Sequence, residues 1–120
     1  MSQASISNYL GEIVIMADYT VTNSSYTFGP QSYTLFGWRE PHFIAVVKSG
    51  NVPAVAILRW ASIASFSDYT SPVAYITRTV FFDTSGVDVR LEPKPVVIYV
   101  TIAMYNATVS AYLIDEGWGP

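Results

Sequence analysis

The sequence contains no cysteine and a single histidine among its 120 residues. Without cysteine the chain can form neither disulfides nor thiolate metal sites, and it has no cysteine nucleophile. One histidine does not build a typical zinc or copper site within one chain. No motif for a nucleophile or a phosphate-binding loop is present either. We therefore expect no metal, no cofactor and no catalytic residue, and we predict that the protein is not an enzyme.

Charge is the second scarcity. Lys and Arg together number six and Asp and Glu nine, which is 12% of the chain, against about 25% in ordinary globular domains. Six basic residues and a net charge of -3 provide no field to neutralise phosphates, which excludes nucleic acid as an expected partner. The hydrophobic content of 51% is opposite to the composition of disordered chains.

Targeting signals are the third scarcity. Met1 to Ser5 lack the basic and long apolar regions of a secretory signal peptide, so we expect synthesis in the cytoplasm of the host and leave the final location open. Pro95 to Ile114 is free of charge and long enough for a membrane-spanning helix. Its β-branched residues and the Asn106-Ala107 pair instead favour two strands, and no membrane span is expected.

Residues that favour strands dominate what is present, because Val and Ile far outnumber Leu and no window shows a sustained helical period. Turn signals occur roughly every ten residues. We predict one all-β domain covering 1–120, an antiparallel sandwich or jelly roll of eight or nine strands, with a small closed barrel as the alternative. The expected strands are 12–22, 26–28, 32–38, 43–48, 52–60, 73–82, 87–91, 96–105 and 108–114.

Three local expectations can be compared directly with the structure. Strict alternation in 12–22 predicts that Ala17 lies on the same face as Ile13 and Ile15. Pro30 is expected to break the chain between two strand pieces, because proline cannot donate to a central ladder. A single helical turn is expected at 6–10.

The densest group of polar and aromatic residues is the segment 37–43. It contains Trp38, Arg39, Glu40 and His42 in an expected loop between strands. A Glu40–His42 pair could exchange protons, but no neighbouring Ser or Thr carries a nucleophile motif. The favoured interpretation is a loop with a local ion pair and a packed Trp, and Arg39, Glu40 and His42 are kept as candidate binding or interface residues.

Aromatic residues form 15% of the chain, and several fall in expected loops or at strand ends. Such rings could pack in the core, lie in a protein interface, or stack on sugars through an apolar face and a polar group. All three alternatives remain open from the sequence. The candidates are Tyr26, Tyr33, Trp38, Tyr69 and Trp118.

The scarcity of charge also bears on association. An all-β domain has sheet edges that are usually protected by Lys, and the chain has only Lys48 and Lys94. The edges must then be closed into a barrel or covered by another chain. We predict a homo-oligomer that uses weakly charged surfaces rich in Tyr, Val and Ile.

A cysteine-free, Lys-poor chain with runs such as Val96-Val97-Ile98-Tyr99-Val100-Thr101 resembles the small orphan proteins of viruses that infect hyperthermophilic archaea. The resemblance is one of composition, and it implies a virus-encoded β protein, including one located in the virion. The expected function is therefore structural or assembly, with copies of itself or other particle proteins as partners. The alternative is a carbohydrate- or surface-binding module that uses loop aromatics, with glycans as partners.

Overall fold

The computed structural model describes residues 5–7, 11–21, 25–31, 38–62, 75–103 and 106–116, and the side chains of 11–20, 38–62, 75–103 and 106–116. Within these residues the chain forms strands and no helix. The strands are β1 (Ser5–Ser7), β2 (Glu12–Val21), β3 (Ser25–Gln31), β4 (Pro41–Gly50), β5 (Ala54–Ser62), β6 (Ile76–Phe82), β7 (Val87–Arg90), β8 (Pro95–Ala103) and β9 (Ala107–Asp115).

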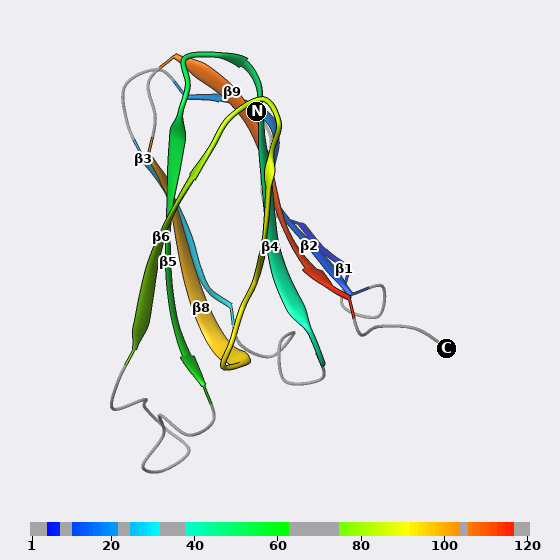
Figure 1. Cartoon of the computed structure of the whole chain (residues 1–120). Helices are drawn as coiled ribbons and strands as arrows, with labels where there is room; N and C mark the ends of the chain where they lie inside the picture. The colour runs from blue at the N-terminus through cyan, green and yellow to red at the C-terminus, as the bar shows by residue number, and fades with distance from the viewer. Residues whose placement is uncertain are drawn as a thin grey trace.

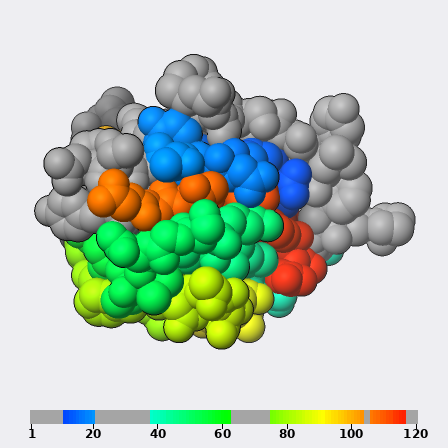
Figure 2. All heavy atoms as spheres, turned by 90° about the horizontal axis from the view of Figure 1, so that it is seen from above, coloured from blue at the N-terminus to red at the C-terminus, as the bar shows by residue number. Residues whose placement is uncertain are grey.

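The strands form two antiparallel layers that face each other (Figure 1). Sheet A has five strands in the order β1-β2-β9-β4-β7, and sheet B has four in the order β3-β8-β5-β6. Seen from above, β2, β9 and the β4–β5 segment lie side by side, in blue, orange and green (Figure 2). The all-β expectation is confirmed, whereas the alternative of a closed barrel is not, because the described strands make two separate sheets.

The strand pairing is that of a jelly roll. The chain from β2 to β9 pairs with itself like a folded ribbon: β2 with β9, β3 with β8, β4 with β7, and β5 with β6. Two further pairings, β4 with β9 and β5 with β8, join this ribbon into the two sheets. Segments far apart in the sequence are therefore neighbours throughout the fold.

The core lies between the two sheets and is formed by alternate residues of each strand. In β4 the odd-numbered residues from Pro41 to Val47 are buried, and in β8 the even-numbered residues from Val96 to Ile102 are buried. Each fully buried large apolar side chain contributes about 1.5–3 kcal/mol relative to its exposed state. The largest of these fully buried side chains include Trp60, Phe43, Ile13, Leu58 and Leu113.

The alternation predicted for β2 is interrupted. Its register against β9 shifts between Val14 and Met16 and again between Met16 and Tyr19. The backbone of Asp18, with a φ of 50°, is in the left-handed region. Such bulges insert extra residues into one strand and reverse the faces that follow. Met16 is consequently buried and Ala17 is exposed, so the expected inward position of Ala17 is wrong.

Two further local expectations are corrected. Pro30 does not end a strand: β3 continues to Gln31, with a register shift between Phe28 and Gln31. Proline is accepted there because β3 is an edge strand and Pro30 lies within the irregular stretch. At the other end of the chain, Ser5–Ser7 pairs with β2 as a strand instead of starting the helical turn expected at 6–10, and the remainder of that turn lies outside the described residues.

The uncharged stretch Pro95 to Ile114 forms β8 and most of β9, as the strand interpretation predicted. The part of the chain that the structure describes contains no helix of the length and apolarity needed to cross a bilayer.

The sheet edges are protected by the strands themselves. In sheet A the edge strands are short, with three residues in β1 and four in β7. In sheet B the edge strand β6 carries Arg78, which is paired with the buried Leu58. Arg78 therefore occupies one of the strand positions that alternate toward the core, and a charge at such an inward-phase position remains exposed at the edge. Short edges and inward-phase charges both oppose strand addition. These three edges therefore need neither closure into a barrel nor a covering chain. The fourth edge strand, β3, has no charged residue, and its Pro30 lacks a backbone N–H for strand addition.

Gly50 connects the β4–β5 turn with the β8–β9 turn, and its backbone has a φ of 101°. A Cβ at this position would overlap the carbonyl oxygen of Asn106 and lie 2.7 Å from the Cα of Ala107. Gly50→Ala should therefore lower the free energy of unfolding by about 2 kcal/mol or more. Urea denaturation followed by tryptophan fluorescence measures this, with the exposed neighbour Ser49→Ala as the control. Equal stability of the two variants would contradict the close packing of these turns.

Candidate functional site

One candidate site lies on the outer face of sheet A, at the end where β4 begins. Pro41 and Phe43 are buried, so the intervening His42 points outward. His42 is paired with Ile114 of β9 on one side and with Arg90 of β7 on the other. Ile114 is in turn paired with Glu12 of β2. The register therefore aligns residues from four strands in one row across the sheet.

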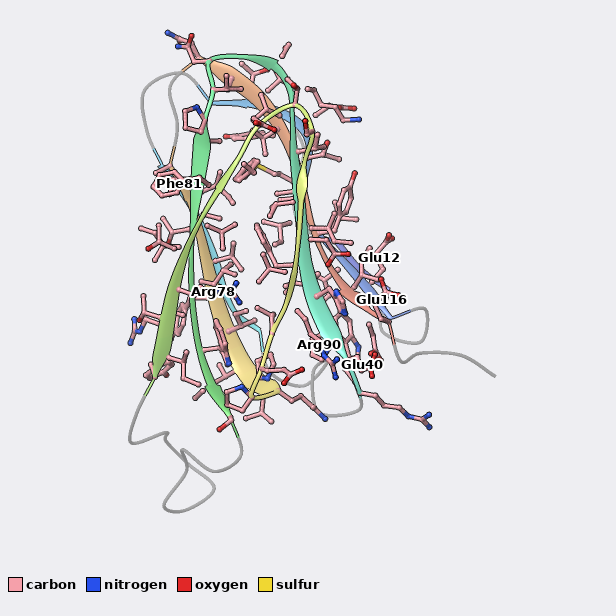
Figure 3. The ribbon with its side chains drawn as sticks, viewed as in Figure 1. Glu12, Glu40, Arg78, Phe81, Arg90 and Glu116 are labelled. Carbon is pink, nitrogen blue, oxygen red and sulfur yellow. The ribbon has the colours of Figure 1, made fainter. Side chains whose placement is uncertain are left out.

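Charged residues gather at this end of the sheet, and we call the group the acidic corner. It contains four carboxylates against one guanidinium, and Figure 3 shows Glu40, Arg90 and Glu116 together on the sheet A side of the molecule. The members of the acidic corner are Glu40, His42, Asp88, Arg90, Glu92 and Glu116.

His42 is paired with Asp88. Its Nδ1 atom lies 2.6 Å from Oδ1 of Asp88, and the side chains are 16% and 55% exposed. Asp88 is two residues before Arg90, the direct partner of His42, so this is a diagonal contact between adjacent strands. This hydrogen bond orients the imidazole ring on the surface of the sheet and engages its Nδ1 atom.

Arg90 forms ion pairs with two other acids of the acidic corner, Glu92 and Glu40. Its Nε lies 2.7 Å from Glu92, and its Nη2 lies 3.5 Å from Glu40. The three side chains are about half exposed, so these pairs stabilise the fold little. Glu40 thus faces Arg90, and the structure brings His42 to Asp88 rather than to Glu40. The sequence paired Glu40 with His42 because they are close along the chain, whereas the sheet register decides the contact.

Asp115 anchors the segment that enters β4. Its carboxylate is buried and accepts the backbone N–H of Glu40 at 2.8 Å and that of Arg39 at 3.1 and 3.2 Å. Two further backbone bonds, from Glu116 to Glu40 and from Leu91 to Pro41, tie the same segment to the ends of β9 and β7. Sequence reasoning missed Asp115, since nothing in a strand-terminal Asp indicates which backbone it binds.

Three side chains of the acidic corner could hold a metal ion. One ligand atom each from His42, Asp88 and Glu116 lies within 4.8 Å of the other two. They come from β4, β7 and the residue after β9, which are separated by many residues in the sequence. An imidazole nitrogen with two carboxylate oxygens is a ligand set used for divalent transition metals. The sequence predicted no metal site, because only the fold assembles this set.

Trp38 is packed in the core, which was one of the three alternatives that the sequence left open and the one favoured for the segment 37–43. Its side chain is 2% exposed and belongs to the hydrophobic core. Its indole Nε1 is buried and has no hydrogen-bond partner among the described residues. Arg39 is exposed. The remaining aromatic candidates lie outside the described side chains, although the backbone of the first is part of β3: Tyr26, Tyr33, Tyr69 and Trp118.

A second candidate surface lies on the outer face of sheet B. Phe81 of β6 is 66% exposed, Ile57 of β5 is 38% exposed, and Val52 in the preceding turn is 51% exposed. Phe81 is paired with the half-buried Val55, which is paired with Ala103 of β8. We call these five residues the sheet B patch. Figure 3 shows the Phe81 side chain directed away from the space between the sheets.

An arginine and two tyrosines border the sheet B patch. The guanidinium carbon of Arg59 lies 4.2 Å from the ring centroid of Tyr75 and 5.2 Å from that of Tyr99. The two rings are 6.1 Å apart and tilted by 57°. Cation–π contacts of this kind hold the charge against the sheet surface. The sheet B patch is thus bordered by the Arg59 guanidinium and the two tyrosine rings that it contacts.

Neither surface can be assigned from known relatives. Comparison of the chain with protein-family models, with curated proteins and with solved structures gave no match. The function must therefore be argued from the two surfaces themselves.

Removal of the Asp115 carboxylate should destabilise the protein. Asp115→Ala leaves the N–H groups of Arg39 and Glu40 without their buried acceptor, which should lower the free energy of unfolding by about 2 kcal/mol. Glu116→Ala, a carboxylate removed from the exposed neighbouring position, should change it by less than about 0.5 kcal/mol. Chemical denaturation of both variants tests the role of Asp115, and similar values would refute it.

Proposed function

We propose that this protein is a non-enzymatic structural or assembly protein that associates with copies of itself through the sheet B patch. The observation that carries this proposal is the exposure of Phe81 and Ile57 on the outer face of sheet B, with Val52 exposed in the turn that precedes β5. Large contiguous apolar surfaces are uncommon on monomeric proteins and indicate interaction sites. Exposed aromatic residues are also the type enriched in protein interfaces.

The distribution of charge supports this face over the others. The four strands of sheet B contain Arg59 and Arg78 and no acidic residue. The carboxylates of the acidic corner lie on the opposite layer. Two copies that meet through sheet B would therefore desolvate no carboxylate of these strands, whereas two acidic corners would repel each other.

The size of the face suits a second copy of the chain. Strands lie about 4.8 Å apart and rise about 3.3 Å per residue, so four strands of seven residues cover on the order of 450 Å² in projection. Side chains and bordering turns add to this, and a standard interface buries about 800 Å² per partner. A two-fold arrangement would place the same uncharged patch on both sides of the interface.

Association by strand addition is not favoured. The edges of sheet A are short, and β6 carries the inward-phase Arg78. The faces remain as the surfaces for assembly. This changes the reason for expecting self-association: the proposal rests on the exposed sheet B patch, which has Arg59 at its border, and not on open sheet edges.

The compositional resemblance to viral orphan proteins extends the proposal to assembly within a virus particle. Jelly rolls occur in viral capsid proteins, and they also occur in lectins and cupins. One fold serves several functions. The jelly roll therefore supports a role in a virus particle only together with the sheet B patch and the compositional resemblance.

A carbohydrate-binding module is the second candidate. It requires exposed aromatic rings, but Trp38 is buried and Arg59 lies over the ring of Tyr75. Among the described residues, Phe81 offers the most exposed aromatic face. The assembly proposal uses this residue together with its apolar neighbours, whereas sugar recognition also needs polar groups that this patch lacks.

Two substitutions on β6 test the assembly proposal. Phe81→Ser removes the most exposed apolar side chain, and Thr79→Arg places a charge beside Ile57, with which Thr79 is paired. Each should convert the oligomer to a monomer at tens of micromolar, because the interface loses apolar contact or must desolvate a charge. Size-exclusion chromatography with light scattering measures the mass.

Ser49→Arg is the matched control, because Ser49 is exposed on β4 of sheet A. It should leave the oligomer intact. A monomeric wild-type protein at the same concentration would overturn the proposal, as would an oligomer that all three variants leave unchanged. An oligomer lost equally in Ser49→Arg would place the interface elsewhere.

A further inference from the structure

We propose that His42, Asp88 and Glu116 form a surface site for one divalent transition-metal ion of the Zn²⁺ type. The site is independent of the sheet B patch, since it lies in the acidic corner of sheet A. It would use one imidazole nitrogen and two carboxylate oxygens, with water in the remaining position. Three protein ligands and an open position are typical of accessible zinc sites.

The spacing of the three ligand atoms suits such an ion. Zinc–ligand distances of about 2.0–2.2 Å place tetrahedral ligand atoms roughly 3.4 Å apart. In the structure the His42–Asp88 pair is 2.6 Å apart, and all three atoms lie within 4.8 Å of one another. The required spacing is longer than the His42–Asp88 distance and shorter than the 4.8 Å limit within which the three atoms lie. Small side-chain rotations, without movement of the strands, would bring the atoms to ligating positions.

The charges at the corner also fit a divalent cation. Asp88 and Glu116 supply two negative charges, and His42 supplies a neutral nitrogen donor, so the ligands balance the charge of the ion. Arg90 is the cation that could otherwise neutralise these acids, but it is paired with Glu92 and Glu40. Among the described residues, no hydrogen bond or ion pair of the Glu116 carboxylate is formed.

The backbone beneath the site is held firmly. His42 lies near the start of β4, where this strand pairs with both β7 and β9. The N–H of Glu116 donates to the carbonyl of Glu40, and the buried Asp115 binds the N–H groups just before β4. Ligands on rigid elements are kept close to their binding geometry before the ion arrives.

Isothermal titration of the untagged full chain with ZnCl₂ tests the proposal, and thermal unfolding with and without zinc provides a second readout. We expect one ion per chain and an increase of the melting temperature, because the ion binds the folded state. His42→Ala and Glu116→Gln should each weaken zinc binding about tenfold or more and remove the thermal shift. Mg²⁺ should bind far more weakly, since an imidazole is a poor ligand for it.

Glu12→Gln is the matched control, because it removes one carboxylate from β2 of the same sheet and alters neither the three ligands nor the ion pairs of Arg90. It should bind zinc like the wild type. Glu116 is exposed, so its variant should remain folded, which circular dichroism without zinc verifies. The proposal is overturned if the wild type does not bind zinc, if both ligand variants bind as the wild type does, or if Glu12→Gln is weakened equally.

Discussion

The mutual burial of two apolar sheet faces is the constraint on which the rest of this structure depends. Sheet A can remove Phe43, Ile13 and Leu113 from water only by packing against the inner face of sheet B, which presents Leu58 and Trp60. Because the chain has no cysteine, and its described residues include no helix, this burial and the backbone ladders carry the described fold. In the jelly roll each sheet combines strands from the first and the second half of the chain, and the backbone ladders join these two halves.

The same constraint determines which residues are left for function. Alternation along each strand sends every second side chain outward, so the two outer faces display what the core does not use. On sheet A these include His42 and Asp88, at the end where Asp115 secures the entry to β4. On sheet B they include Phe81 and Ile57. The two layers thus present surfaces of different chemistry, one acidic with a single imidazole and one apolar with arginine at its border.

The sequence predicted the fold class and most strand positions because periodicity and turn residues are local signals. It failed where a partner strand decides the outcome. Ala17 is exposed because bulges against β9 reverse the alternation, and Pro30 is accommodated because β3 lies at an edge. The packed Trp38 agrees with the favoured interpretation of its segment, but the sequence could not show that Asp115 binds the backbone N–H groups of Arg39 and Glu40 beside it.

The sequence by itself determined that the protein is all-β and that it has little charge and no cysteine. These properties depend on composition and on period, which require no knowledge of contacts. Only the tertiary structure decided that His42 is hydrogen-bonded to Asp88 and lies near Glu116, and that Phe81 and Ile57 share one exposed face. The reason is the register of strands distant in the sequence, which is fixed by how the two inner faces pack and not by the residues beside each side chain.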